Sequence, residues 1–395
     1  MSNLEVQQLT DGNVMNTYAR FPIALVRGEG ARVWDADGKE YLDFVAGIAV
    51  NSLGHCHPAV AKAVSEQVRS LIHVSNLYHI EPQARLAKAL CDHSFADRVF
   101  FCNSGAEANE AALKLARRYG SERAGGRSEV ITALNSFHGR TLATLTATGQ
   151  EKIRLGFDPL PPGFRYVPFN DLEAAEDAVD ERTAAILVEP IQGEGGVVVP
   201  DVSYIRGLRQ LCDDKGLLLM FDEVQVGMGR TGRLFGYEHF GVEPDVMTLA
   251  KALGGGLPLG AMLAREEVAG SFPPGSHAST FGGNPVVCRA GLAVVETILE
   301  AGLVEHCEEV GGVLRQGLEA LAGRFGFIRE VRGEGLLLGM EMDRECGPMV
   351  QECMKEGLLV VLAGPNVLRM VPPLTIGQAE VDEALEILER VLERV

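Results

Sequence analysis

The chain has 395 residues, enough for two domains or for one large α/β domain with a smaller one. Hydrophobic residues make up 46% of it and charged residues 23%, as in an ordinary folded protein, and the formal net charge of −18 argues against a nucleic-acid or anionic-membrane surface. No apolar run approaches the roughly 18 residues that a membrane-spanning helix needs.

The cysteines indicate a reducing compartment. There are eight of them, none forms a C-x-x-C pair, and most lie inside apolar patterns. No signal peptide is recognisable at the N-terminus. We therefore expect buried thiols and a cytoplasmic protein.

The first part of the chain predicts little regular structure. Residues up to about 17 are polar, and we expect them to be loosely ordered. Residues 18–44 contain short strands and turns, which predict a small β-meander. The sequence His55-Cys56-His57 invites a metal site, but no further ligand pair lies nearby at a familiar spacing, and Pro58 can open a helix over 59–72. We expect a loop that packs or lines a cleft, and no metal.

From about residue 98 to residue 264, strands alternate with helices. Strands are expected at 98–102, 129–134, 184–188, 217–221, 244–250 and 261–264. Helices are expected at 81–93 and 204–215, and a further helix follows the 103–110 loop and ends at residue 119. Residues 156–168, with four prolines, predict an irregular loop. The alternation predicts a mostly parallel sheet with helices on both faces. Beyond it we expect a helix over 286–301, a strand over 335–342 and a closing helix over 378–395.

Polar and aromatic side chains directly follow the predicted strands. Parallel sheets bind ligands at the carboxyl ends of their strands. Seven residues fall there: Ser104, Phe137, Arg140, Glu194, Asp222, Gln225 and Lys251. This common placement favours one shared cleft over seven unrelated structural roles.

Lys251 lies between an apolar strand and three glycines at 254–256. A lysine at a strand end, kept from water, loses solvation of its ammonium form, so its pKa falls and it becomes a useful amine nucleophile. A surface lysine in a turn is the commoner meaning of this pattern, so the interpretation needs support from other residues.

The neighbouring residues provide what a phosphate-bearing aromatic aldehyde requires. Ser104 precedes a helix, whose first N–H groups stabilise a phosphate, although a capping box with Glu107 explains the same residues. Phe137 offers a flat face for a ring. Asp222 can hold a protonated ring nitrogen, and Gln225 can donate to a ring oxygen. Pyridoxal 5'-phosphate needs this set of parts.

Five motifs make the chain resemble the fold-type I, class III aminotransferases, and among them the acetylornithine aminotransferases. They are N-S-G-A-E-A-N-E at 103–110, F-H-G-R at 137–140, E-P-I-Q-G-E-G-G at 189–196, D-E-V-Q at 222–225 and L-A-K at 249–251. The resemblance covers nearly the whole chain. It implies an α/β fold, with a large domain at 48–285 built on a mostly parallel sheet and a smaller α+β domain formed by both chain ends, 1–47 and 286–395.

The resemblance also implies the cofactor contacts. Lys251 would hold pyridoxal phosphate covalently and, once free, move a proton, while Asp222 would pair with the ring nitrogen. The remaining cofactor-binding residues would be Ser104, Gly105 and Ala106 at the phosphate, Phe137 and Gln225 at the ring, Glu223 and Val224 beside them, and Thr280, which would reach the phosphate of the other subunit. A homodimer with shared sites follows.

For the substrates, the resemblance implies that Arg140 holds a carboxylate, with Ser279 nearby from the other chain. Arg369 would take the α-carboxylate of glutamate, and Glu194 would pair with Arg369 when the other substrate is bound. The implied reaction moves the terminal amino group of N-acetyl-L-ornithine to 2-oxoglutarate by a ping-pong route, a step in arginine biosynthesis.

Three residues depart from the family pattern. Ala106 stands where a threonine is frequent, which removes a hydroxyl near the phosphate, and Val226 replaces a usual threonine. Ile48 matches a position that is tyrosine in ornithine aminotransferases. An aliphatic side chain there favours an acylated ornithine, because no hydroxyl remains to hold a free α-amine.

Other functions stay open at different levels. Succinylornithine, N-succinyl-diaminopimelate, ornithine and 4-aminobutyrate are alternative amino donors. A nucleotide-binding P-loop protein would explain the acidic strand end at 217–223, but no G-x-x-x-x-G-K-[ST] occurs. No G-x-G-x-x-G follows an early strand, which disfavours a nicotinamide enzyme. Intact Lys251 and Asp222 argue against a non-enzymatic dimer.

Overall fold

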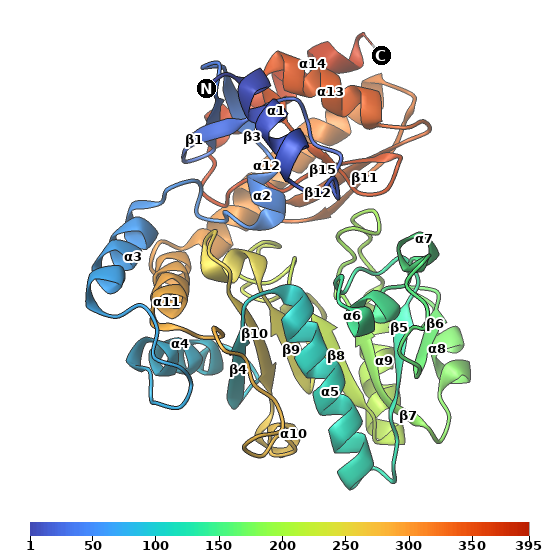
Figure 1. Ribbon diagram of the computed structural model, residues 1–395. Coiled ribbons are helices and arrows are strands. Elements are labelled where there is room, and N and C mark those ends of the chain that lie inside the picture. The colour runs from blue at the N-terminus through green and yellow to red at the C-terminus, as the bar shows by residue number, and fades with distance from the viewer. Residues whose placement is uncertain (395) are drawn as a thin grey trace.

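A seven-stranded sheet forms the centre of the computed structural model, which describes residues 1–394 (Figure 1). Its order is β4-β10-β9-β8-β7-β5-β6, and within it only β10 runs antiparallel to its neighbours. The strands are β4 (Arg98–Cys102), β5 (Glu129–Ala133), β6 (Phe164–Val167), β7 (Thr183–Val188), β8 (Leu218–Asp222), β9 (Val246–Leu249) and β10 (Gly260–Ala264). The predicted mostly parallel sheet is confirmed.

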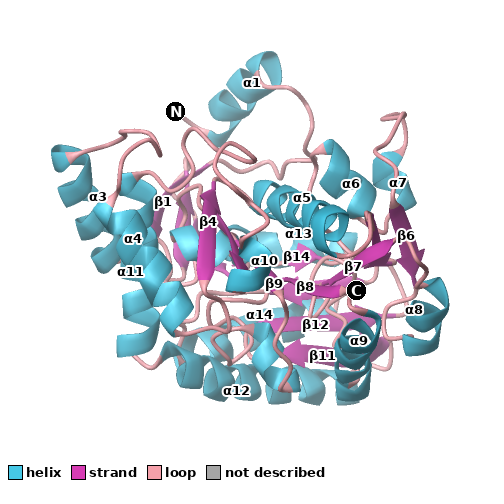
Figure 2. Ribbon diagram, turned by 90° about the horizontal axis from the view of Figure 1, so that it is seen from below, coloured by secondary structure: helices cyan, strands magenta, loops and turns pink. Residues whose placement is uncertain are grey.

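Helices cover both faces of this sheet. Along β7, Ala185 and Leu187 pack with helix α5 (Gly105–Arg123), whereas Ile186 and Val188 belong to the core of helices α9 (Val202–Lys215) and α11 (Pro285–Glu300). The view from below separates α5 from α9 across the strands (Figure 2). The flanking helices are α3 (Pro58–Ser70), α4 (Glu81–Asp92), α6 (Leu142–Ala147), α7 (Glu151–Arg154), α8 (Leu172–Ala178) and α10 (Glu266–Ala269), with 3-10 turns η1 (Gly236–Phe240) and η2 (Lys251–Gly254). Within the described residues, no helix combines the length and apolar character needed to cross a membrane.

Both chain ends build the upper part of Figure 1, where the two termini lie. One sheet joins β1 (Leu25–Glu29), β2 (Arg32–Asp35) and β3 (Glu40–Asp43) to β13 (Leu358–Leu359), which runs parallel to β3. Another has the order β11 (Ile328–Glu334), β12 (Leu337–Met342), β15 (Val367–Met370) and β14 (Val361–Leu362). The helices here are α2 (Ala46–Ala49), α12 (Leu303–Arg324), α13 (Gly347–Glu356) and α14 (Gln378–Leu392). The domain boundaries at 47 and 285 stay a prediction.

Three expectations were wrong. Residues 3–13 form helix α1 (Asn3–Asn13), whose start is fixed by a capping box between Ser2 and Glu5. No residue of α1 is buried, so no apolar stripe marked it in the sequence. Residues 164–167, placed in an irregular loop because of the prolines before them, form edge strand β6. Cys56 is exposed rather than buried, although all eight cysteines are free.

Arg230 joins the central sheet to the sheet that contains β15. Its guanidinium donates to the carbonyl of Leu336 at 3.1 Å, to the carbonyl of Pro372, and to the Ser52 hydroxyl at 3.2 Å. Burial lowers the pKa of Arg230 to about 10. Across residues 1–394 no carboxylate pairs with it, so neutral acceptors from three distant segments hold this cation.

Two adjacent glycines of α12 test how closely this helix packs against the turn between β11 and β12. A Cβ on Gly311 would lie 2.2 Å from the carbonyl oxygen of Gly335, whereas a Cβ on Gly312 would meet nothing within 4 Å. We expect Gly311→Ala to lower the free energy of unfolding by about 1–3 kcal/mol through overpacking. Gly312→Ala should raise it by up to about 1 kcal/mol through helix propensity. Urea unfolding of both variants checks this, and equal shifts would contradict the close approach.

Candidate active site

A cavity of about 490 Å³ opens at the carboxyl ends of the central strands. It contains most of the predicted site residues because parallel strands end at one edge of a sheet. Those that line it are Ser104, Gly105, Ala106, Phe137, Arg140, Asp222, Val224, Gln225 and Lys251. The pairing of β8 with β9 places Asp222 opposite Thr248, three residues before the lysine.

The backbone at Lys251 is strained. Its φ is +37°, a left-handed value that is uncommon for a residue with a side chain. Lys251 starts η2, and Ala250 separates it from the end of β9. Burial lowers the pKa of Lys251 to about 8, and the Glu194 carboxylate works in the opposite direction. At neutral pH a larger share of this amine is therefore unprotonated than for an exposed lysine.

Asp222 is held by two residues to which the sequence analysis gave no role. Asn109 of α5 and His138 both donate to its Oδ2 at 2.7 Å, through Nδ2 and Nδ1. Among the residues that the structure describes, the Oδ1 atom accepts only the Val224 N–H, at 3.0 Å, and keeps an acceptor position free. Asn109 stands among the alanines of a buried helix face, and a polar residue in an apolar stripe is a signal that could have identified it.

The start of α5 forms one wall of the cavity. Ser104 is the N-cap, and its hydroxyl accepts the Glu107 N–H at 3.2 Å. The Glu107 carboxylate bonds to Asn103 instead of returning to Ser104, so the expected capping box does not form. A Cβ on Gly105 would lie 2.8 Å from Val224, which leaves space only for backbone there. Unpaired N–H groups at such a helix start suit an anion.

Phe137 and Arg140 lie together at the cavity, and the guanidinium carbon is 4.6 Å from the centre of the ring. Glu189, another residue without an assigned role, also lines the cavity. Its carboxylate accepts the N–H groups of Phe137 at 3.1 Å and Gly193 at 3.3 Å. Burial raises the pKa of Glu189 to about 7, and the Asp222 charge adds to this effect.

Glu194 and Arg369 form an ion pair beside the cavity. Arg369 Nη1 lies 2.6 Å from Glu194 Oε1 and 2.8 Å from Gln225 Oε1, and Gln225 Nε2 donates to Glu194 at 3.2 Å. Arg369 is 1% exposed, so solvent hardly reaches the arginine of this pair. Burial opposes ionisation of Glu194, but the Arg369 cation lowers the pKa of that carboxyl below its ordinary value. Gln225 thereby connects the ion pair to the cavity.

Three predicted residues lie elsewhere. The Glu223 carboxylate is buried away from the cavity, where it accepts the N–H groups of Gly236 at 2.6 Å and Tyr237 at 2.7 Å. Ser279 and Thr280 line a separate pocket, which shares Asn103 with the cavity. Asn103 Nδ2 donates to the Ser279 hydroxyl at 3.2 Å, so the two pockets are neighbours.

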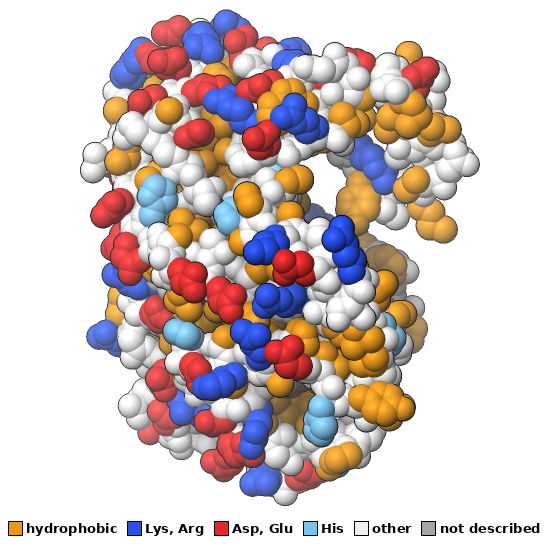
Figure 3. Space-filling view, turned by 90° about the vertical axis from the view of Figure 1, so that its left-hand side faces the viewer, with side chains coloured by type: hydrophobic (Ala, Val, Ile, Leu, Met, Phe, Trp, Pro, Cys, Tyr) orange, Lys and Arg blue, Asp and Glu red, His pale blue; other side chains and the backbone are white. Residues whose placement is uncertain are grey.

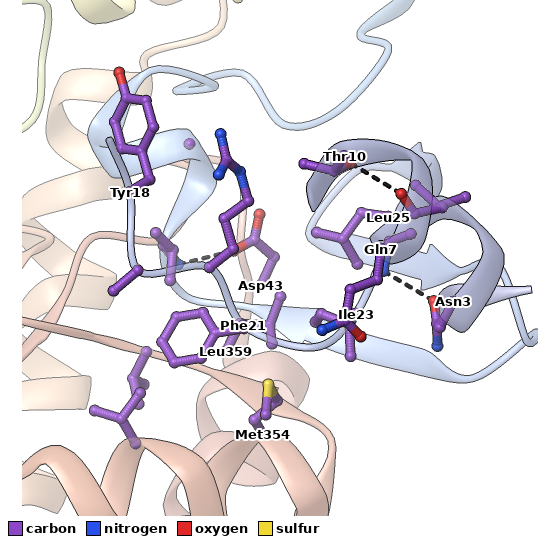
Figure 4. Close-up of a pocket in the computed structure, with 18 of the residues that line it drawn as sticks. Asn3, Gln7, Thr10, Tyr18, Phe21, Ile23, Leu25, Asp43, Met354 and Leu359 are labelled. Atoms are coloured by element: carbon purple, nitrogen blue, oxygen red, sulfur yellow. Dashed lines mark hydrogen bonds between the residues drawn. The ribbon is translucent and has the colours of Figure 1, made fainter. Parts of the chain in front are cut away.

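A larger cavity, of about 620 Å³, lies between α1, residues 16–25 and the end of α13 (Figure 4). Phe21, Met354 and Leu359 lie together at its floor, and the space-filling view shows an open hollow beside this part of the chain (Figure 3). Of its two carboxylates, Asp43 is bound by His55 at 2.7 Å and by two backbone N–H groups, whereas Asp11 is exposed on α1. No lysine is among the residues that line this cavity, so it offers no lysine amine to an aldehyde.

The smaller cavity fits a flat aromatic aldehyde that carries a phosphate. An amine of lowered pKa, a fixed carboxylate with a free acceptor position, a helix start and an aromatic ring surround one space. In the described residues, no group of three or more potential metal ligands comes together. The residues present thus suit pyridoxal phosphate, which relies on such a set of contacts.

Comparisons with known proteins agree with this interpretation. A family model described as aminotransferase class-III matches residues 14–392. An acetylornithine aminotransferase of Caldanaerobacter subterraneus subsp. tengcongensis is 54% identical over 97% of this chain and 98% of that protein, and one of Gloeobacter violaceus is 56% identical over 99% and 98%. The crystal structure of an ornithine aminotransferase from Toxoplasma gondii is similar with a TM-score of 0.97, at 34% identity over 100% of this chain and 96% of that one.

The lowered pKa of Lys251 predicts how the protein takes up pyridoxal phosphate. Only the neutral amine attacks the aldehyde, so the uptake rate of the cofactor-free protein should rise through a midpoint near pH 8. Glu194→Gln removes a charge that raises this pKa, so the midpoint should move to lower pH. Stopped-flow absorbance measures both rates. A midpoint near 10.5, the value of an ordinary lysine, would contradict the burial argument.

Proposed function

Because this chain belongs to the class-III aminotransferases, which use pyridoxal phosphate, we propose that it transfers the terminal amino group of N-acetyl-L-ornithine to 2-oxoglutarate. The observation that carries the choice of donor is the identity of more than half to relatives named acetylornithine aminotransferase, over nearly the whole of both chains. Such a reaction yields N-acetylglutamate semialdehyde and glutamate, and it would serve arginine biosynthesis.

The two arginines suit two substrates of different charge. N-acetylornithine carries one carboxylate, far from its reacting amine, whereas glutamate carries a second one beside its amine. In our proposal Arg140, exposed at the cavity, binds the distant carboxylate of both substrates. Arg369 binds the second carboxylate of glutamate, and Glu194 neutralises Arg369 whenever the substrate lacks that group. One site can then accept both partners of a ping-pong reaction.

The other residues divide the remaining tasks. When bound, pyridoxal phosphate supplies an electron sink for the charge that develops on the substrate carbon. Asp222, oriented by Asn109 and His138, keeps a proton on the ring nitrogen. Lys251 holds the cofactor and then moves the proton at the reacting carbon. Ser104, Gly105 and Ala106 bind the phosphate, Phe137 stacks on the ring, and Gln225 contacts the ring oxygen.

We also propose a homodimer with shared sites. Asn76 donates to the carbonyls of Ser279 and Gly282, at 3.2 and 2.9 Å, which brings residues 71–78 beside 279–282. This surface exposes large apolar side chains, among them Leu77, which is 85% exposed. Such a patch is typical of an interface. A second copy covering it would bring Ser279 and Thr280 toward the neighbouring cavity.

The location of the enzyme belongs to the same proposal. All eight cysteines are free, and burial raises the pKa of most of them, for example that of Cys102 to about 12. Unpaired thiols persist in a reducing compartment. We propose the cytoplasm, where the substrates of amino-acid biosynthesis are found.

The donor is identified by a half-reaction. The protein with bound pyridoxal phosphate, which is yellow, is mixed separately with N-acetylornithine, succinylornithine, ornithine or 4-aminobutyrate. The loss of the cofactor absorbance is followed. We expect fast bleaching by N-acetylornithine and little by ornithine, because the resemblance places Ile48 where ornithine aminotransferases have a tyrosine hydroxyl. We also expect little bleaching by 4-aminobutyrate. Ile48→Tyr should raise the rate with ornithine relative to N-acetylornithine, and Lys251→Ala should not turn over. Preference for ornithine or 4-aminobutyrate would refute the donor and leave the family intact.

The role of Arg140 predicts a separate defect. Arg140→Gln removes the cation at the cavity, and loss of a charged hydrogen-bonding partner costs about 1.5–3 kcal/mol, or at least tenfold in KM. The KM of both N-acetylornithine and 2-oxoglutarate should rise, while the cofactor content stays near that of the unaltered enzyme. Steady-state kinetics and the absorbance of the bound cofactor measure these quantities. Loss of cofactor with unchanged KM would reassign Arg140 to cofactor binding.

A further inference from the structure

Arg332 and Arg369 stand in one row on the sheet of the chain ends. Arg332 of β11 pairs with Gly339 of β12, and Gly339 pairs with Arg369 of β15. Residues directly opposite each other on antiparallel strands share a face of the sheet. The two arginines therefore point to the same side, and Gly339 leaves the space between them free of a side chain.

The loop that contains Glu194 lies on this face. A Cβ on Gly339 would come within 3.0 Å of the Val197 side chain, so the loop covers the gap between the arginines. Arg369 holds the Glu194 carboxylate at 2.6 Å. Arg332 Nε donates to the carbonyls of Gly196 at 2.9 Å and Val197 at 3.2 Å. One arginine thus contacts the side chain of the loop, and the other contacts its backbone.

The loop is strained where Arg332 holds it. Gly196 has φ +117° and Val197 has φ +54°, and a β-branched residue in the left-handed region is a true outlier. Such a conformation persists only where surrounding contacts enforce it. Arg332 itself is fixed by ion pairs with Glu330 at 2.6 Å and with Glu341. Its position is therefore set by its own sheet rather than by the loop.

We propose that Arg332 is a positioning residue: it clamps residues 196–197 in their strained form and so keeps Glu194 closed on Arg369. The inference rests on the proposed role of Arg369 as the site of the second carboxylate of glutamate. A dicarboxylate has to displace Glu194 before it binds, so the clamp opposes dicarboxylates. A substrate without a carboxylate beside its amine gains, because Arg369 stays neutralised.

Removing Arg332 should therefore strengthen, and not weaken, the binding of a dicarboxylate. In Arg332→Gln the loop relaxes, Glu194 withdraws, and Arg369 becomes free for a second carboxylate. We expect the holoenzyme to bind glutarate, a dicarboxylate that cannot react, about tenfold more tightly by calorimetry. Valerate, which has one carboxylate, should bind within twofold of its affinity for the unaltered enzyme. The rate of the N-acetylornithine half-reaction should fall relative to that of glutamate, also by about tenfold.

Arg315→Gln is the matched control. Arg315 donates to the carbonyl of Gly333 at 3.1 Å, next to Arg332, and pairs with Glu319, but these bonds stay within α12 and β11. It should leave the affinities for glutarate and valerate unchanged. Arg332→Lys, which retains a cation able to donate to the same carbonyls, should recover part of the original selectivity. If Arg332→Gln does not fold, the affinities of Arg332→Lys for glutarate and valerate test the clamp in its place.

Four outcomes would overturn the clamp. General damage would weaken both ligands together, and no tightening of glutarate in either Arg332 variant would show that the loop holds its shape without Arg332. An equal effect of Arg315→Gln would assign the change to the sheet. If neither the unaltered enzyme nor Arg332→Gln binds glutarate better than valerate, the proposed role of Arg369 fails first, and the clamp fails with it. Bleaching by N-acetylornithine tests the donor independently of these measurements.

Discussion

The parallel pairing of β8 with β9 is the contact on which the site depends. It sets Asp222 opposite Thr248 and brings Lys251, just beyond, to the same edge of the sheet. Helix α5 secures both strands through one side chain, because Asn109 accepts from the Thr248 hydroxyl at 2.7 Å and donates to Asp222 at 2.7 Å. Asn109 thus holds the carboxylate from the core, and His138, in the loop after β5, completes its support.

Charges in this region are balanced unevenly. Glu194 and Arg369 neutralise each other, and Asp222 has two strong donors, whereas Lys251 has no ion-pairing carboxylate within residues 1–394. A lysine left unpaired in an enclosed place gives up its proton more easily, which the reaction requires. Arg230 is also a buried cation without an ion-pairing carboxylate within residues 1–394, but its role is structural. A guanidinium cannot readily lose its charge, so it tolerates burial only by sharing that charge among the carbonyls of the segments it joins.

Sequence patterns predicted the parallel sheet and the strand-end residues because buried strands are apolar runs and ligand sites follow their ends. The order of the strands and the antiparallel direction of β10 depend on long-range pairing, which periodicity does not report. Helix α1 escaped because it buries no residue. Asn109 and His138 stood inside quoted motifs, but their shared bond to Asp222 exists only in three dimensions. Arg332 is far from every motif, and only the register of three strands reveals it beside Arg369.

The pairing of β3 with β13 has a consequence for synthesis of the chain. The central strands, from residue 98 to residue 264, leave the ribosome in one uninterrupted block. In contrast, about 315 further residues must be synthesised after β3 before its neighbour at Leu358 is made. At 5–20 residues per second this takes roughly 15–60 s. During that time one edge of β3 has unpaired N–H and C=O groups, the kind of edge along which nascent chains associate. The early strands therefore stay open to such association until translation is nearly complete.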